Sequence, residues 1–349
     1  MLPKKKQRIS LYVFVALELI LFFTGFFFYS YLPDNWLVLI LGVCNTWYIA
    51  TIYITFLLLL VELIRFLNKK FSLFSSQLIL KLKRIQAIVF GGILLVVFAL
   101  LGYGYYCVLN PVVTHVHVDL SKQHAPTDSI KLLMMTDLHI GELIGEQTLT
   151  KYVDLANSQG ADLMVLNGDI VDYELRFANR ANAPQLLSKL HAPLGVYAIL
   201  GNHEYRASIH AKKKWLKEIE GITLLVDSIV SPNGAFYLVG RDDYINKARK
   251  SLHHLLQGVE KEKPVIVADH QPAAIHEMLM NKIDLGIHGH THAGQLWPNN
   301  WRLQLVYDFI YGLHRKGNTQ FYVSSGTGSA YPPVRVGTCS EIAVLHIHY

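Results

Sequence analysis

Five short motifs rich in aspartate, histidine and asparagine have the residue types and spacing of a metal site. In chain order, they are Asp137-Leu-His139, Gly168-Asp169 with Asp172, Gly201-Asn202-His203-Glu204, His270, and Gly289-His290-Thr291-His292. Carboxylate, imidazole and amide donors suit Mn, Fe and Zn, and one carboxylate can bridge two cations about 3.5 to 4 Å apart, the separation used in displacement at phosphorus. No cysteine takes part, which disfavours a structural zinc site. The motifs therefore predict a hydrolytic site with two metal ions.

Each motif follows a short apolar run that is typical of a β-strand. These runs cover residues 131–135, 162–167, 195–200, 264–269 and 284–288. Ligands of α/β proteins bind in the crevice outside the carboxyl ends of the strands, so we expect the five motifs to meet there. A glycine precedes the motif in three cases and allows the backbone to approach closely.

The elements between the motifs indicate the fold class. Helices are expected over residues 146–159, 208–219, 246–260 and 272–281, and they alternate with the strands before the chain ends in further strands. Such alternation is typical of an α/β domain in which two packed sheets are flanked by helices.

Most of the apolar excess of the chain lies before residue 110. The sequence has 349 residues, of which 52% are hydrophobic, and it contains apolar runs over residues 9–32, 36–64 and 85–109. A span of about 20 apolar residues crosses the hydrocarbon core of a bilayer. We therefore expect three transmembrane helices in a membrane anchor of residues 1–110, a linker over 111–130, and a catalytic domain over 131–349.

The net charge of +6 does not indicate a nucleic-acid partner, because the basic residues flank the apolar runs. The N-terminus and the segment from Arg65 to Arg84 are basic, and cytoplasmic segments beside membrane spans carry such an excess. A multi-pass protein of the cell membrane with an extracytoplasmic catalytic domain is therefore expected, whereas one span fewer would place that domain in the cytoplasm. The three cysteines, Cys44, Cys107 and Cys339, cannot form a disulfide framework.

The ordered set of motifs, from Asp-x-His through Gly-Asn-His-Glu to Gly-His-x-His, resembles the calcineurin-like metallophosphoesterase superfamily over residues 130–349. The apolar N-terminus is similar to that of membrane-bound bacterial members. The resemblance implies a four-layer α/β/β/α sandwich. No ligand of the family pattern is missing.

The resemblance also implies a role for each motif residue. One metal would be held by Asp137, His139, Asp169 and His292, and the other by Asp169, Asn202, His270 and His290. Asp169 would be the bridge, and a metal-bridging hydroxide would attack phosphorus. His203 would contact the phosphate and protonate the leaving oxygen, since an imidazole titrates near neutral pH. Asp172 and Glu204 are expected behind the ligands, where they would orient them or His203.

Other residues near the motifs have two interpretations each. Tyr331 and Arg335 lie in a glycine-rich segment, residues 324–338, and either contact substrate or form a structural turn. Trp297, Trp301 and Tyr311 either form an apolar wall or lipid-facing lip, or pack in the ordinary way. His288 is interpreted as a packed residue or one that lies behind the ligands, and His346 and His348 as surface or packing residues.

The expected function is that of a membrane-anchored, metal-dependent phosphoric ester hydrolase with two divalent cations (Mn, Fe or Zn). Its partners would be membrane lipid and a phosphoester or pyrophosphate substrate that is lipid-linked or envelope-associated. One alternative is an enzyme similar to the UDP-2,3-diacylglucosamine pyrophosphate hydrolases of lipid A synthesis, whose substrate is cytoplasmic. Another is a catalytically silent metal-binding membrane sensor.

Overall fold

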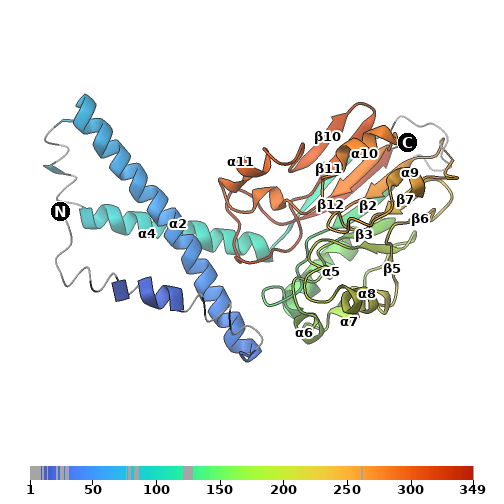
Figure 1. Cartoon of the computed structure of the whole chain (residues 1–349), viewed down its shortest axis with the longest axis horizontal. Coiled ribbons are helices and arrows are strands. Elements are labelled where there is room, and N and C mark those ends of the chain that lie inside the picture. The colour runs from blue at the N-terminus through green and yellow to red at the C-terminus, as the bar shows by residue number, and fades with distance from the viewer. Residues whose placement is uncertain are drawn as a thin grey trace. The chain divides into compact units, whose positions relative to one another are not determined.

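The chain divides into two units, one formed by residues 1–105 with 331–334 and the other by residues 106–330 with 335–349. The structure, a computed structural model, describes residues 31–75, 86–120, 129–260 and 262–348, with scattered positions between 9 and 27 and at 77, 80 and 81. Figure 1 labels the elements of both units. We refer to them as the N-terminal unit and the catalytic unit.

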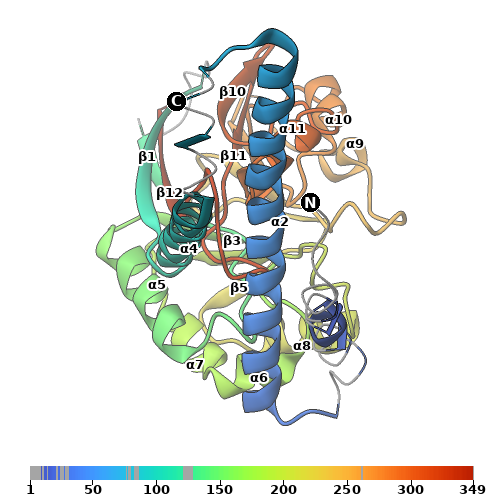
Figure 2. The same cartoon turned by 90° about the vertical axis from the view of Figure 1, so that its left-hand side faces the viewer.

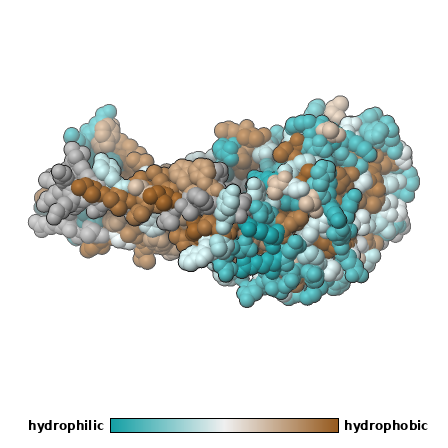
Figure 3. Space-filling model, turned by 60° about the horizontal axis from the view of Figure 1, so that its bottom comes forward, coloured by the Kyte–Doolittle hydropathy of each residue, from teal (hydrophilic) through white to brown (hydrophobic). Residues whose placement is uncertain are grey.

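The N-terminal unit contains α2 (Asp34–Phe71), of 38 residues, and most of α4 (Gln86–Leu109). Both helices are long and apolar enough to cross a membrane. Large apolar side chains lie on their outer surfaces; Leu59 is 64% exposed and Leu95 is 73% exposed. Figure 3 shows apolar residues gathered over these helices. Because exposed side chains of this kind are unfavourable in water, the two helices indicate membrane association.

The second apolar run forms a longer helix than its sequence predicts. The sequence predicts a span over residues 36–64, but α2 continues to Phe71 through the first part of the basic segment. Glu62 forms an ion pair with Arg65 one turn later, which compensates the charge of the carboxylate near the end of the apolar run. The first run, residues 9–32, lies largely outside the described residues, so the count of three spans stays a prediction.

Two six-stranded sheets form the centre of the catalytic unit. The first has the order β1 (Val112–Asp119), β12 (Glu341–His348), β2 (Ser129–Met135), β3 (Leu163–Asn167), β4 (Val196–Ile199), β5 (Ile222–Leu224). The second has the order β10 (Gly312–Lys316), β11 (Thr319–Val323), β9 (Leu285–His288), β8 (Val265–Ala268), β7 (Tyr237–Gly240), β6 (Ser228–Val230). Strands β2 to β5 are mutually parallel, as are β7, β8, β9 and β11. Their carboxyl ends therefore lie at common edges.

The two sheets pack face to face, and helices cover their outer faces (Figure 1). Side chains of β2, β3 and β12 share one buried core with side chains of β7, β8 and β9. The first sheet is covered by α5 (Glu146–Ser158), α6 (Leu175–Arg180), α7 (Ala183–Leu187) and α8 (Ile209–Lys217), and the second by α9 (Leu252–Leu255) and α10 (Ile275–Met280). The five strands expected before the motifs are all present. The predicted four-layer α/β/β/α fold is confirmed.

Part of the segment expected to be a linker is a strand of the first sheet. Residues 112–119 form β1, which pairs in parallel with β12 along its whole length. The reason lies in the alternation of β-branched residues, because Val112, Thr114, Val116 and Val118 recur at every second position. A linker was expected because polar residues lie between these β-branched positions.

The helix expected over residues 246–260 is also shorter than predicted, since only Leu252–Leu255 are α-helical. The residues before it form turns that carboxylates stabilise. Asp227 Oδ2 accepts a hydrogen bond from the Lys250 backbone nitrogen at 2.8 Å, and Asp242 Oδ2 accepts one from Asn246 Nδ2 at 2.9 Å. Asn246 Oδ1 also accepts a hydrogen bond from the Ala248 backbone nitrogen at 3.0 Å. Bonds from the backbone to side chains, such as those to Asp227 and Asn246, compete with helix formation.

A disulfide joins Cys107, near the end of α4, to Cys339, just before β12. Their Cα atoms lie 5.0 Å apart although 232 positions separate them in sequence. Sequence spacing gave no signal for this pairing, because only the fold brings the two segments together. Only Cys44 is a free cysteine among the described residues.

Candidate active site

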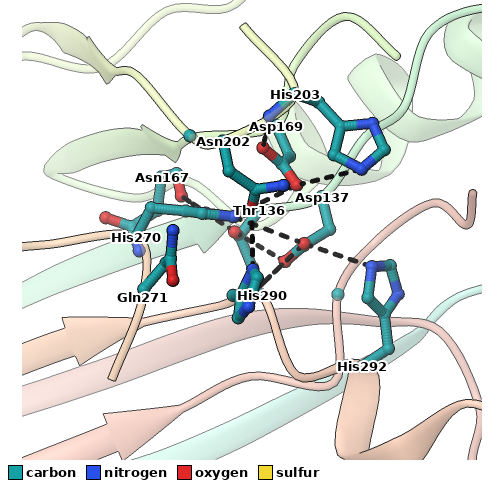
Figure 4. Close-up of polar contacts among 12 residues, drawn as sticks. Thr136, Asp137, Asn167, Asp169, Asn202, His203, His270, Gln271, His290 and His292 are labelled. Atoms are coloured by element: carbon teal, nitrogen blue, oxygen red, sulfur yellow. Dashed lines mark hydrogen bonds and ion pairs between the residues drawn. The ribbon is translucent and has the colours of Figure 1, made fainter. Parts of the chain in front are cut away.

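The seven predicted ligands converge at the carboxyl ends of β2, β3, β4, β8 and β9. Figure 4 labels these ligands except His139. Six of the ligands form two groups, and within each group the donor atoms lie within 4.8 Å of one another. One group comprises Asp137, His139 and His292, and the other comprises Asp169, His270 and His290. Asn202 joins the second group, since its Oδ1 lies 2.7 Å from His290 Nδ1. Five loops distant in sequence thus deliver oxygen and nitrogen donors to one place.

Asp169 lies between the two groups of ligands. Its Oδ2 is 3.8 Å from His139 Nε2 and 3.2 Å from His270 Nε2. Asp137 also faces both groups, with Oδ1 at 3.2 Å from His292 Nε2 and 3.8 Å from His270 Nε2. The position of Asp169 is compatible with the predicted bridge, which stays a prediction.

The two carboxylates are buried close together among imidazoles. Asp137 is 0% exposed and Asp169 is 2% exposed. Burial acts to raise the pKa of Asp137, but the neighbouring His292 and His270 outweigh it and hold that pKa below its usual range. Burial lowers the pKa of His292 to about 4, so this imidazole is neutral, the form that binds a metal. Buried like charges are costly unless positive charge compensates them, which two cations would do.

The residues fit a pair of divalent cations. His270 Nδ1 donates to the Asn167 carbonyl oxygen at 2.8 Å, and its Nε2 faces Asp169 Oδ2 at 3.2 Å. That Nε2 atom is buried and has no hydrogen-bond partner among the described residues. A buried polar atom of this kind calls for a partner that the protein does not supply. The mixed nitrogen and oxygen set suits a borderline cation such as Mn²⁺, Fe²⁺ or Zn²⁺.

Three further imidazoles have their second nitrogen near a polar group. His290 Nε2 lies 3.0 Å from Tyr307 Oη, and His292 Nδ1 lies 3.1 Å from the guanidinium of Arg335. His139 Nδ1 is 3.4 Å from Asp172 Oδ1. Such partners fix the orientation of a ligand ring and its tautomer. The role of Tyr307 was not predicted, because nothing in its spacing relates it to the motif that ends at His292.

His203 is held by Asp172 beside the metal ligands. Its Nδ1 lies 2.5 Å from Asp172 Oδ1, and its Nε2 faces Asp169 Oδ2 at 3.9 Å. The ring meets His139 edge-on, with centroids 4.4 Å apart. The expected position of Asp172 behind His203 and a ligand agrees with these distances.

Glu204 orients backbone near the site. Its carboxylate accepts hydrogen bonds from the backbone nitrogens of Asp169 at 2.9 Å and Gly201 at 2.7 Å, which ties the two ligand loops together. Lys212, buried at 1% exposure, donates to the His203 carbonyl oxygen at 2.7 Å. Burial and the charge of Asp169 raise the pKa of Glu204 to about 7, whereas Lys212 opposes this shift. Lys212 was missed because a lysine-rich helix reads as a solvent-exposed face.

Strained backbone is concentrated at the ligands. Five of them have positive φ: Asp137 (55°), His139 (47°), Asp169 (50°), His290 (69°) and His292 (49°). Each such residue costs roughly 1 to 3 kcal/mol and persists only where the surrounding structure imposes it, most often at functional sites. Gly289 allows this packing, because a Cβ there would overlap Thr136 Oγ1 and Asp137 Oδ2. The close backbone approach expected of the motif glycines is confirmed at this position.

Arg335 is buried beside a predicted ligand, and its contact with substrate stays a prediction. The side chain is 1% exposed, and besides His292 its guanidinium contacts the carbonyl oxygen of Gly328 at 2.7 Å. Its long side chain reaches inward to backbone carbonyl oxygens of Gly326 and Gly328. Tyr331 is half-buried in the same segment, and its contact with substrate stays a prediction. Trp301 is 59% exposed and its ring meets that of Trp297 edge-on, with centroids 5.4 Å apart, so its place in an apolar wall stays a prediction.

Comparison with known proteins places the chain in a family. The model of the calcineurin-like phosphoesterase family matches residues 130–294. An uncharacterized metallophosphoesterase of Helicobacter pylori strain J99 is 32% identical over 259 residues, which cover 71% of this chain and 68% of that protein. A transmembrane protein with metallophosphoesterase domain from Bos taurus is 32% identical over 257 residues, 67% of this chain and 56% of that protein. The chain therefore belongs to the calcineurin-like metallophosphoesterase family.

Among solved structures, the protein TT1561 of Thermus thermophilus is similar with 16% sequence identity and a TM-score of 0.40. The similarity covers 58% of this chain and 90% of that one. The match to the family model and the curated relatives supports metal binding and a hydrolase of the metallophosphoesterase type.

Proposed function

We propose that this protein is a membrane-anchored phosphoric ester hydrolase that uses two divalent cations to cleave a phosphoester or pyrophosphate bond in an amphiphilic substrate. The observation that supports it most directly is the convergence of two buried carboxylates with four imidazoles at the carboxyl ends of neighbouring strands. Ligand sets of this composition suit cations that promote displacement at phosphorus.

Each cation would have four protein ligands. One would be held by Asp137, His139, Asp169 and His292, and the other by Asp169, Asn202, His270 and His290. When bound, the cation pair would lower the pKa of water and stabilise negative charge on the phosphoryl oxygens. The chain itself then has to position the substrate and supply a proton.

His203 is the proton donor in this proposal. With Nδ1 held by Asp172 at 2.5 Å, the ring directs Nε2 toward the ligand cluster. A proton on Nε2 would pass to the leaving oxygen, which removes the cost of expelling an alkoxide. Asp172 accepts the Nδ1 proton of His203 and stabilises the imidazolium form, which carries the second proton on Nε2. No protein nucleophile is required.

An exposed apolar surface beside the cluster supports an amphiphilic substrate. We call it the apolar lip, and it consists of Trp301 (59% exposed), Leu305 (88%) and Val306 (65%). Trp301 lies on α11 (Asn299–Leu303), and Leu305 and Val306 lie in the turn that follows it. This turn comes directly before Tyr307, which contacts His290. Exposed apolar patches of this kind mark binding surfaces. The hydrocarbon part of the substrate would lie on the lip while its phosphate reaches the metal ligands.

The disulfide supports an extracytoplasmic catalytic unit. Disulfides persist in oxidising compartments and are rare in the cytosol, and the pair Cys107–Cys339 lies in the catalytic unit. Lys69 and Lys70 at the end of α2 support the same placement, because basic residues beside a span favour the cytoplasmic side. If α4 then crosses the membrane, the catalytic unit lies on the opposite side. Thiol labelling of intact cells tests this placement. Free Cys107 and Cys339 thiols that only a membrane-permeant reagent reaches would favour the cytoplasmic alternative, with a nucleotide-linked substrate.

The proposed function is tested on the full-length chain in detergent, stripped with chelator and then supplied with Mn²⁺, Fe²⁺ or Zn²⁺. A water-soluble aryl phosphodiester and an aryl phosphodiester with a fatty-acyl chain serve as substrates. We expect metal-dependent cleavage of both, and faster cleavage of the acylated one. Absence of turnover with every metal would contradict the hydrolase and favour a metal-binding sensor.

The lip is tested by the double variant Trp301→Ser/Leu305→Ser. Cleavage of the acylated substrate should fall while cleavage of the soluble one is unchanged. Met280→Ser is the matched control, because Met280 is an apolar side chain on α10 that is 71% exposed. An equal loss on both substrates, or none, would contradict the amphiphilic substrate and leave the hydrolase intact.

A further inference from the structure

Four histidines form a ladder on the first sheet, outside the ligand cluster. His115 and His117 lie on β1, and His346 and His348 lie on the neighbouring strand β12. Residues at every second position of a strand point to the same face. His117 pairs with His346 in the parallel register, so the two pairs lie side by side. Figure 2 shows β1 at the edge of its sheet beside β12.

The four rings are in contact. His115 Nδ1 lies 3.0 Å from His346 Nε2. The ring of His117 stacks on that of His346 with centroids 4.9 Å apart, and on that of His348 with centroids 6.0 Å apart. Three of the rings are exposed and His346 is half-buried. The ladder is therefore open to ions from solution, and burial of apolar surface does not explain it.

The ladder is separate from the predicted catalytic ligands. His346 pairs with Lys131 and His348 pairs with Ser129, at the amino end of β2. The ligand Asp137 follows the carboxyl end of the same strand. Six residues of extended chain at about 3.3 Å each separate Lys131 from Asp137, or about 20 Å. No predicted ligand of the active site can therefore reach the ladder.

The charges around the ladder permit a cation. Lys131 and Arg315 are competing positive charges, but Lys131 Nζ donates to the Gln159 carbonyl oxygen at 2.9 Å and Arg315 Nη2 to the Asp119 carbonyl oxygen at 3.3 Å. Asp119 lies on the same face of β1 and pairs in register with His348. Burial and the neighbouring imidazoles lower the pKa of His346, which keeps its lone pair available for a metal.

We propose that this histidine ladder binds one divalent transition cation, such as Zn²⁺, Cu²⁺ or Ni²⁺, with His115 Nδ1 and His346 Nε2 as the first two ligands. Two nitrogens at Zn–N distances of about 2.0 to 2.1 Å lie about 3.3 Å apart in a tetrahedral site. The observed 3.0 Å needs a shift of only a few tenths of an ångström. His117 supplies a third nitrogen by a rotation of its exposed side chain. An all-imidazole set excludes Mg²⁺ and Ca²⁺, which require oxygen ligands.

The test uses the full-length chain in detergent, purified without a histidine tag and stripped with chelator. Cu²⁺ is the probe, and bound copper is counted by equilibrium dialysis and identified by the nitrogen couplings in its EPR spectrum. The variant His115→Gln/His346→Gln should bind one Cu²⁺ fewer than the wild type. The control His253→Gln/His254→Gln removes two exposed histidines of α9 and should bind as many as the wild type. Equal copper content in the ladder variant and the wild type would overturn the proposal.

A second background separates the two sites. In a chain that carries Asp169→Asn, the Cu²⁺ EPR signal with imidazole nitrogen couplings should remain. Adding His115→Gln/His346→Gln to that chain should remove the signal. Loss of this signal with Asp169→Asn alone would overturn the proposal. His115→Gln alone, at an exposed position, should weaken Cu²⁺ binding without changing thermal unfolding. Unchanged Cu²⁺ affinity in this folded single variant would likewise contradict the ladder site.

Discussion

The ligand loops of the catalytic unit and the helices of the N-terminal unit depend on sequence in opposite ways. In the loops, single side chains and positive φ angles determine the arrangement, and even a methyl group at Gly289 would not fit. In α2 and α4 the requirement is collective, because about 20 apolar residues of many kinds span a bilayer. Substitutions should therefore have large, specific effects in the ligand loops and small effects in the helices.

Among variants that keep their metal ions, the largest effect is expected for His203→Ala. Removal of a positioned acid should lower kcat by about 10² to 10⁴-fold. Metal content should not change, because His203 is not among the predicted ligands. His276→Ala, at an exposed position of α10, is the control. A variant that retains kcat, or that loses its metal, would contradict the assigned role.

A smaller effect is expected for Tyr307→Phe, which removes the hydroxyl 3.0 Å from His290 Nε2. Loss of a partner that orients a ligand typically lowers metal affinity by about 10 to 100-fold. Activity should recover at saturating metal, which distinguishes positioning from a direct part in the reaction. Tyr244→Phe, an exposed tyrosine, should leave the metal titration unchanged. An unchanged titration for Tyr307→Phe would show that His290 needs no such partner.

Gly289→Ala and Gly102→Ala compare the two regions with the same added methyl group. At Gly289 the Cβ would overlap Thr136 and Asp137, and overpacking of this kind destabilises by about 1 to 3 kcal/mol. At Gly102, in α4, a Cβ meets no described atom within 4 Å. We expect a lower unfolding temperature and weaker metal binding for the first variant and no loss for the second. Similar unfolding temperatures for both would remove the contrast between the regions.

The smallest expected effect is a pH dependence at His288. Burial lowers the pKa of this histidine, and its Nδ1 donates to the Asp269 carbonyl oxygen at 2.6 Å. The folded state keeps it neutral, so its contribution to stability is present above about pH 6.5, the pKa of an unfolded histidine, and is lost as pH falls. In His288→Asn the urea midpoint of the chelator-treated protein should fall less between pH 7.5 and 5.5. A fall equal to that of the wild type would contradict a neutral His288.

The sequence predicted the layers and which polar side chains converge, because both follow from local pattern. A ligand such as Asp169 comes directly after a buried apolar strand, and the carboxyl ends of parallel strands meet. The partners of the ligands were not predictable in this way. Tyr307 and Arg335 reach their histidines only through tertiary packing, and the partner of His270 is a backbone carbonyl that any residue could supply. Strand β1 was likewise not predicted, because its segment is polar and its pairing with β12 depends on the tertiary fold.

The central claim, that Asp169 joins two metal ions in one hydrolytic site, is tested most directly by counting metal ions per chain. The measurement is elemental analysis of Mn²⁺-loaded full-length protein, with hydrolysis assayed on the same samples. The control is Asp154→Asn, at an exposed position of α5. We expect two ions per chain and activity in the wild type and the control, and at most one ion and no activity in Asp169→Asn. Two ions and full activity in Asp169→Asn would contradict the bridge.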